Sequence, residues 1–202
     1  MIDPGPIEQK TDEELAREAR AGSRRSFDEL ALRYKRRLFV YLRPRLGSDQ
    51  DAEDLVQETF LKLYRNIRHY DPAHRFSTWL YTSANRLAIS SYRRKRTVAA
   101  GLGSKVADFP ADLAGPRAGE TRSTGLWEAA GTLGGNQYRV LWLRYGEDLT
   151  IEEIAVSIGR SRLAVRLLLH RARTNLMKRV GSAPGRAEAK TKTVAVGETP
   201  LG

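Results

Sequence analysis

The segment that most constrains the fold runs from Thr150 to Val180 and reads TIEEIAVSIGRSRLAVRLLLHRARTNLMKRV. Thr150, followed three residues later by Glu153, forms a capping box, in which both side chains accept hydrogen bonds from backbone N–H groups at a helix start. Gly159 permits the left-handed turn that ends this helix, and Ser161 is suited to cap a second one. The pattern predicts two short helices joined at a turn, which is a helix-turn-helix.

The second of these helices has an apolar seam and a basic side. At 100° per residue the seam consists of Val165, Leu169, Ala172 and Leu176. Between Arg160 and Arg179 the sequence holds seven Lys or Arg and no acid. In a helix-turn-helix the second helix enters the major groove, where guanidinium groups bind phosphates or the acceptor edge of guanine. A basic, solvated helix in an ordinary bundle is the simpler alternative, but the cap, the turn and the one-signed charge together favour DNA binding.

Composition also favours a polyanionic partner. The 202 residues carry a formal net charge of +11, and releasing counterions from phosphates drives association of such a chain with nucleic acid. A membrane surface would share this attraction, but no apolar run approaches the roughly 20 residues that span a bilayer. The N-terminus has no signal-peptide core, so we expect a cytoplasmic protein. With no cysteine and three scattered histidines, we expect no metal, no cofactor and no enzymatic activity.

Helical periodicity dominates the chain, which predicts an all-α protein of two small helical domains. We expect a four-helix domain at 10–97, a flexible linker at 98–124, a helix-turn-helix domain at 125–180 and a disordered tail at 181–202. The linker is predicted because 97–124 is rich in Gly, Ala and Pro and lacks amphipathic order. In the first domain, a capping box at Thr11 and Glu14 opens one helix. Three more helices are expected at about 26–46, 51–67 and 77–96, with a kink or early stop at Pro44 and a cap at Ser77.

The predicted helix at 51–67 has two unlike faces. Its apolar face consists of Ala52, Leu55, Val56, Thr59, Phe60, Leu63 and Ile67. Its opposite face consists of Asp54, Gln57, Glu58, Leu61 and Arg65. The acidic run DAEDLVQE would repel DNA, so the second face suits a protein partner. The alternative is a plain surface whose acids complement the helix dipole, which is the better interpretation for Asp51 and Glu53.

The predicted helix at 77–96 reverses the charge. Its second half, RLAISSYRRKR, has five basic residues and no acid, and four aromatic residues precede it in HYDPAHRFSTWLYTSAN. Cations that follow phosphates and rings that stack on bases suit unpaired DNA. For Phe76 and Trp79 we favour the core, because large aromatics usually dominate packing. The stripe that contains Tyr81 and Asn85 could equally pack against another helix. The candidates for phosphate contact are Arg93, Arg94 and Arg96, although basic residues also stabilise a helix C-terminus.

The order of these segments resembles a known family. The chain is similar to a bacterial RNA polymerase sigma factor of the extracytoplasmic-function (ECF) class. The segments that carry the resemblance are, in order, DAEDLVQETFLKLYRNI, FSTWLYTSANRLAISSYRRKR and, after a linker, YRVLWLRYGEDLTIEEIAVSIGRSRLAVRLLLHRAR. The resemblance covers both domains. It implies a non-catalytic subunit of core RNA polymerase that recognises promoter DNA and can have an anti-sigma factor. Region 2 would bind the clamp helices of β′ and melt the −10 element, and region 4 would bind the −35 element and touch the β flap.

The resemblance also implies site residues. Polymerase contacts would fall at Asp54, Gln57, Glu58 and Leu61. Contacts with the −10 element would fall at Arg75, Phe76, Ser77, Trp79, Asn85, Arg93, Arg94 and Arg96. Contacts with the −35 element would fall at Ser161, Arg162, Arg166, Arg171 and Arg173. The alternative function is a free-standing helix-turn-helix regulator that binds duplex DNA without polymerase, although the first domain has no evident effector or dimerisation module.

The recognition helix departs from the family in its apolar residues. Leu167 and Leu168 stand where the family commonly has a small polar residue and Arg. Leu163 and Leu167 lie almost opposite the packing seam, so we expect them to be exposed. Three roles are open: contact with thymine methyl groups, packing against an anti-sigma protein or another domain, or weakened −35 recognition.

Overall fold

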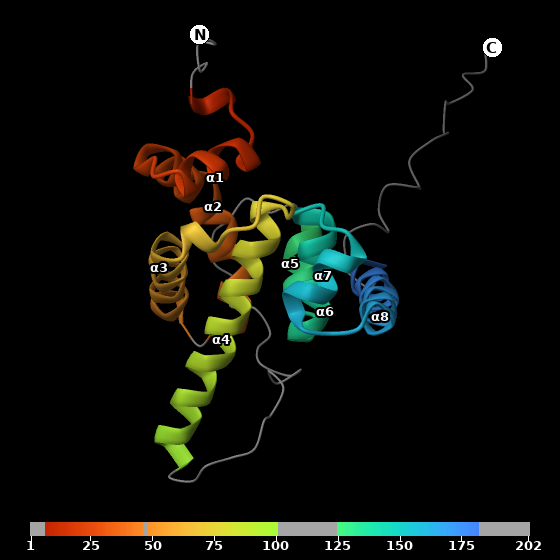
Figure 1. The fold of residues 1–202 in the computed structure, drawn as a ribbon. Helices are drawn as coiled ribbons and strands as arrows, with labels where there is room; N and C mark the ends of the chain where they lie inside the picture. Colours follow the sequence, from red (N-terminus) through yellow and green to blue (C-terminus); the bar gives the residue numbers. More distant parts are fainter. Residues whose placement is uncertain (1–6, 47, 101–124, 182–202) are drawn as a thin grey trace, which may run out of the picture.

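Helices make up the regular secondary structure of the described chain, as the periodicity predicted. The structure is a computed structural model that describes residues 7–46, 48–100 and 125–181 (Figure 1). The described ranges contain α-helices, short 3-10 turns and one π-helical turn, and no strand. Of the expected linker at 98–124 and the expected tail at 181–202, residues 98–100 belong to the helix Phe76–Ala100 and Gly181 ends the helix Arg162–Gly181, and the rest lie outside the described residues. None of the described helices is both long and apolar enough to cross a membrane.

The first unit, residues 7–100, holds four α-helices. They are α1 (Asp12–Arg20), α2 (Arg24–Leu42), α3 (Asp49–Arg65) and α4 (Phe76–Ala100). The predicted capping box at Thr11 and Glu14 is confirmed, with both reciprocal hydrogen bonds formed. The early stop at Pro44 is confirmed as well, because α2 ends at Leu42 and a 3-10 turn at Arg43–Arg45 follows it.

The prediction that Ser77 caps α4 is wrong. The helix already begins at Phe76, and Ser77 is a buried residue of its first turn. The physical reason is the aromatic packing of Phe76, whose ring lies 5.5 Å from that of Tyr34 and 6.1 Å from that of Tyr70. Because this ring packs in the core, the first turn of α4 is buried. Ser77 therefore lies inside the helix and not at the solvent-exposed position that precedes it.

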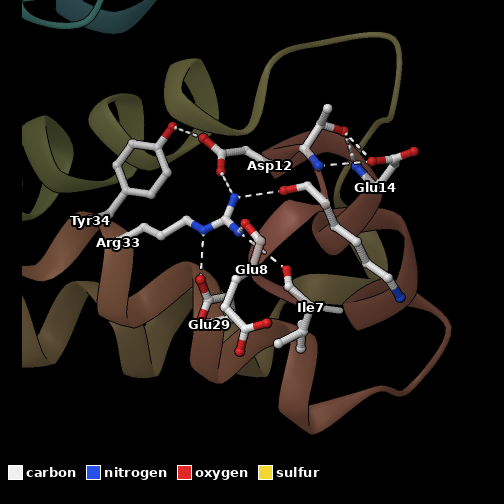
Figure 2. Close-up of polar contacts among 9 residues, drawn as sticks. Ile7, Glu8, Asp12, Glu14, Glu29, Arg33 and Tyr34 are labelled. Atoms are coloured by element: carbon white, nitrogen blue, oxygen red, sulfur yellow. Dashed lines mark hydrogen bonds and ion pairs between the residues drawn. The ribbon is translucent and has the colours of Figure 1, made fainter. Parts of the chain in front are cut away.

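The N-terminal turn at Ile7–Gln9 is fastened to α2 by a single arginine. The Arg33 guanidinium donates to the carbonyl oxygens of Ile7, at 3.2 Å, and Glu8, at 3.0 Å. Figure 2 shows how these groups lie around the guanidinium. It also pairs with the Asp12 carboxylate at 2.9 Å and with that of Glu29 at 2.7 Å. This arrangement satisfies backbone acceptors that precede α1 and fixes its packing on α2.

The second unit, residues 125–181, contains the helix-turn-helix. Its elements are α5 (Gly125–Gly131), α6 (Gly135–Leu141), a π-helical turn (Trp142–Gly146), α7 (Ile151–Ile158) and α8 (Arg162–Gly181). The capping box of Thr150 and Glu153 is confirmed, and Gly159 ends α7 with a left-handed φ of 65°. Ser161 caps α8, since its Oγ accepts from the N–H of Ala164 at 3.2 Å.

The two units pack against each other through helices rather than lying apart. α7 lies alongside α4, and α3 covers the other side of α4 (Figure 1). Buried side chains of both units belong to one hydrophobic cluster, which runs from Leu15 in α1 to Ala172 in α8. At one edge the Tyr138 hydroxyl donates to the carbonyl oxygen of Val40, at 3.1 Å. The surfaces of α4 and α2 that face α7 and α6 are therefore interior in this arrangement.

Candidate nucleic-acid and polymerase interfaces

The two faces predicted for α3 are confirmed by burial. Residues of the apolar face are buried or half-buried against α2 and α4. The opposite face is exposed, and it consists of Asp54, Gln57, Glu58, Leu61 and Arg65. Leu61 has 56% of its surface exposed, and nearby Tyr64 has 46%. An acidic surface with apolar residues at one end is chemically suited to a protein partner.

The α8 surface is also open to solvent. The candidate DNA contacts Ser161, Arg162, Arg166, Arg171 and Arg173 are all exposed. Two of the guanidinium groups have neighbours in their own unit: Arg162 lies 3.6 Å from the Glu152 carboxylate, and Arg173 lies over the Tyr145 ring at 5.5 Å. The predicted seam is confirmed: Val165, Leu169 and Ala172 are buried, and Leu176 is half-buried against the core. One face of α8 therefore packs on the core, and the other presents cations.

The expected exposure of the apolar pair on α8 is confirmed. Leu163 is 66% exposed and Leu167 is 50% exposed, whereas Leu168 is half-buried against the core. Val156, at the end of α7, is 64% exposed and lines a shallow pocket together with Gly159 and neighbouring residues. The recognition helix thus presents apolar as well as basic side chains.

The candidate −10 contacts on and just before α4 fall into an exposed group and a covered group. Arg93 and Arg94 are exposed, and Arg96 lies in the same helix with a side chain outside the described residues. Arg75, just before the helix, is exposed, and its Nη1 donates to the carbonyl oxygen of Asp148 in the second unit, at 2.9 Å. The basic end of α4 is thus accessible, while its start lies against the second unit.

The covered group of −10 candidates lies in the first three turns of α4. Phe76 and Ser77 are buried, which confirms the core interpretation for Phe76, and Trp79 is half-buried. Asn85 is 1% exposed, and its amide is bonded on both sides. Its Oδ1 accepts from the Tyr41 hydroxyl at 2.8 Å and from Arg45 Nη1 at 3.1 Å, and its Nδ2 donates to the Ser157 carbonyl of α7 at 3.0 Å. In this arrangement the Asn85 side chain cannot meet a DNA base.

A buried carboxylate joins the two units, and no local sequence pattern predicted it. Glu147 follows the π-helical turn and is 4% exposed. Its Oε1 accepts from the Tyr81 hydroxyl at 2.6 Å and from Arg37 Nε at 3.1 Å, and its Oε2 lies 2.7 Å from Arg37 Nη2. Burial raises the pKa of Glu147, and the hydrogen bond from Tyr81 and the charge of Arg37 counteract that shift. We call these three residues the Glu147 cluster.

Two arginines are buried near the same interface. Arg45, after α2, is 2% exposed, and Arg139, in α6, is 4% exposed. Arg45 donates to Asn85 and lies over the Tyr41 ring at 5.1 Å, while Arg139 donates to Asn136 Oδ1 at 3.0 Å. Burial, assisted by the positive charge of Arg139, lowers the pKa of Arg45 to about 10. The interface therefore contains like charges as well as the favourable contacts of Glu147.

Comparison with known proteins identifies both units. Residues 30–98 match the family "Sigma-70 region 2", and residues 129–178 match "Sigma-70, region 4". RNA polymerase sigma factor CarQ of Myxococcus xanthus is 30% identical over 162 residues, which cover 80% of this chain and 93% of CarQ. The chain belongs to the sigma-70 family of RNA polymerase sigma factors. It is a member of the ECF class, as the resemblance implied.

Two further similarities support the class and the fold of this sigma factor. The ECF RNA polymerase sigma factor SigW of Bacillus subtilis is 34% identical over 80 residues, which are 40% of this chain and 43% of SigW. The structure of CnrH in complex with the cytosolic domain of CnrY superposes with a TM-score of 0.58 at 21% identity, covering 85% of this chain and 98% of that one. The match to SigW spans less than half of that relative, and the match to CnrH shows the fold.

Proposed function

We propose that this sigma factor binds core RNA polymerase and directs it to specific promoters, with region 2 melting the −10 element and region 4 binding the −35 element. The observation that carries the proposal is the presence of both regions in one chain, with an acidic, leucine-containing face on one and an exposed basic recognition helix on the other. Such a role places the protein in the cytoplasm, where polymerase and promoter DNA are found.

For polymerase binding we propose the exposed face of α3. Asp54, Gln57, Glu58 and Leu61 line it, and the β′ clamp helices are the proposed partner. Acidic and amide side chains around one apolar residue can supply a polar rim and an anchor. Region 4 would contact the β flap. The structural neighbour CnrH has been solved in complex with the cytosolic domain of another protein, CnrY, and we propose that an anti-sigma factor can bind this chain too.

For promoter binding we propose different roles for the two regions. The exposed arginines of α8, with Ser161 at its start, would contact the −35 duplex through phosphates and base edges. In region 2 the basic end of α4 would follow the DNA backbone, and Trp79 and Asn85 would capture an unstacked −10 base. The second role requires Asn85 to leave the contacts described above.

The function is tested by reconstitution. The purified chain is added to core RNA polymerase and genomic DNA, and run-off transcripts are sequenced to identify a promoter. We expect transcripts that depend on the chain and on both units, together with permanganate reactivity of thymines in the −10 region. A chain that binds duplex DNA equally well without polymerase and never opens the −10 region would support the free-standing regulator instead; the match to region 2 disfavours it.

The polymerase face has its own test with a matched control. Asp54→Arg combined with Gln57→Ala should abolish co-purification with core polymerase, because it reverses charge at the centre of the exposed face. Glu53→Arg serves as the control, since Glu53 is also exposed on α3 but lies outside that face. Equal loss in both variants would mean that total charge, not this surface, governs binding.

A further inference from the structure

Two leucines lie on the exposed face of the recognition helix α8. Leu163 is 66% exposed and Leu167 is 50% exposed, and we call them the leucine pair. They are four residues apart in one helix, so their Cβ atoms are about 6 Å apart on one face. At 100° per residue that face is roughly opposite the buried seam of Val165, Leu169 and Ala172. The pair therefore lies where a helix that enters a groove would meet the base edges.

The side chains around the leucine pair are basic or polar. Arg166 and Arg171 lie on either side of the pair on the helix surface, and both are exposed. His170 and Thr174 continue the same face toward the C-terminus, and both are exposed as well. The sequence of α8 contains no Asp or Glu. Such a surface attracts the phosphates that border a DNA groove, and the leucine pair then faces the bases between them.

The major groove offers one kind of apolar group to these leucines. Each base pair presents hydrogen-bond donors and acceptors there, and thymine adds a C5 methyl group. A leucine placed over a donor or an acceptor would displace water without replacing the lost hydrogen bond, which is unfavourable. Contact with a methyl group instead buries apolar surface on both partners, which is favourable. The leucine pair is therefore chemically suited to thymine.

The spacing of the pair limits how far apart two such thymines can be. Successive base pairs are about 3.4 Å apart along the duplex. The separation of about 6 Å between the leucine Cβ atoms thus corresponds to one or two base-pair steps. Because the major groove distinguishes T·A from A·T, each thymine can be recognised on either strand.

We infer that the leucine pair makes this recognition helix specific for two thymines within two base-pair steps of each other in the −35 element. The inference rests on the proposed function, since it names bases that region 4 would recognise. It favours one of the three roles that are open for these leucines. Packing against the other domain is not favoured, because neither unit covers the pair in the described chain. The surrounding cations favour DNA over a protein partner.

Uracil in place of thymine tests the inference, because the two bases differ only by the C5 methyl group. Holoenzyme is reconstituted from core polymerase and the full-length chain, and its binding is measured on the promoter identified by run-off sequencing. Uracil replaces the −35 thymines singly and together, and in control duplexes it replaces thymines of the spacer between the two elements. Wild type is compared with the double variant Leu163→Ala, Leu167→Ala.

We expect each contacted methyl group to contribute about fourfold to the binding constant, and two of them about 15-fold. The double variant should bind the unmodified promoter about as weakly as wild type binds the doubly substituted one. Uracil should then weaken the double variant by less than about twofold, since side chain and methyl group form one contact and their losses are not additive. Uracil in the spacer should leave the binding of both proteins nearly unchanged.

A matched variant separates this contact from a general loss of exposed leucine. Leu32→Ala removes a leucine that is 74% exposed on α2, and it should bind and respond to uracil as wild type does. Circular dichroism should show the same helix content in all variants, because the replaced side chains are exposed. Promoters whose −35 elements lack such a thymine pair would overturn the inference, and so would equal binding of thymine and uracil duplexes by wild type.

Two other outcomes have separate meanings. If the double variant binds the promoter as wild type does, the leucines do not contact bases, the inference is wrong, and a protein partner becomes the better explanation of their exposure. If the wild-type chain does not bind core polymerase, the proposed function fails. The same comparison, made with the free chain on duplexes selected for binding to it, then decides the inference by the uracil effect alone.

Discussion

The two helices expected to touch DNA, α8 and α4, differ in how much of their candidate surface is open. On α8 all five candidate residues are exposed, and the apolar seam alone is buried. On α4 the basic end is exposed, but Asn85 and the first turn are covered by the second unit and by the core. The surface proposed for duplex recognition is thus open in this arrangement, whereas the surface proposed for base capture is covered.

The difference shows that the accessibility of each face of a helix depends on which neighbouring helices cover it. One face of α8 packs on the core, and its other face is exposed to solvent. α4 packs on α3 with one face and on α7 with a second, so that the second face, which is the one proposed to bind DNA, is covered. Each of the following predictions tests one part of this contrast.

The largest effect is the expected difference in stability between substitutions on the buried and exposed faces of α8. Leu169→Ala should lower the free energy of unfolding by about 2–5 kcal/mol, because Leu169 is 4% exposed and its loss leaves a cavity in the core. Leu167→Ala, the matched control on the exposed face, should change it by less than about 0.5 kcal/mol. Urea denaturation followed by circular dichroism measures both. Similar losses would contradict the assigned seam.

The next effect concerns the covered face of α4. Asn85→Ala should destabilise the free chain by about 1–3 kcal/mol, because the Tyr41 hydroxyl, the Arg45 guanidinium and the Ser157 carbonyl each lose a buried partner. Arg86→Ala, one position along on the exposed side, is the control and should be nearly neutral. Thermal unfolding measures the difference, and a neutral Asn85→Ala would mean that the amide contributes nothing to the closed arrangement.

Local sequence patterns predicted most of the helices, because caps, periodicity and turn residues act over a few positions. Both capping boxes, the left-handed Gly159 and the exposure of Leu163 and Leu167 followed from such patterns. The start of α4 did not, since the packing of Phe76 on Tyr34 involves a residue far away in the chain.

The contact between the units was beyond local patterns for the same reason. Glu147 stands 110 positions after its partner Arg37, and nothing near it in the sequence shows that it is buried. The stripe of α4 that contains Asn85 predicted that this face could pack against another helix. It did not identify that helix as α7. Long-range pairing of single residues is set by the whole fold and not by periodicity.

A third prediction compares the exposed arginines of the two helices. Arg166→Ala in α8 should weaken binding of the promoter by about 1–3 kcal/mol with a preference at one base step, if its guanidinium reads a base edge. Arg93→Ala in α4 should weaken binding evenly across sequences and reduce the salt dependence of log K by about one unit, as expected for a phosphate contact. Competition binding of holoenzyme to promoter variants at several salt concentrations separates the two. A uniform loss for Arg166→Ala would assign it to phosphate.

The smallest effect compares the two capping boxes, which are chemically alike but differently placed. Thr150→Ala and Thr11→Ala each remove a side-chain cap, so each should cost about 1 kcal/mol of stability. Only Thr150→Ala should also favour separation of the units, because its partner Glu153 accepts a hydrogen bond from Thr78 of α4, and losing the cap releases that carboxylate. Glu14, the partner of Thr11, has no such bond to the second unit among the contacts described. Scattering and thermal unfolding of both variants measure the two effects separately, and equal opening in both would remove Glu153 from the contacts that hold the chain closed.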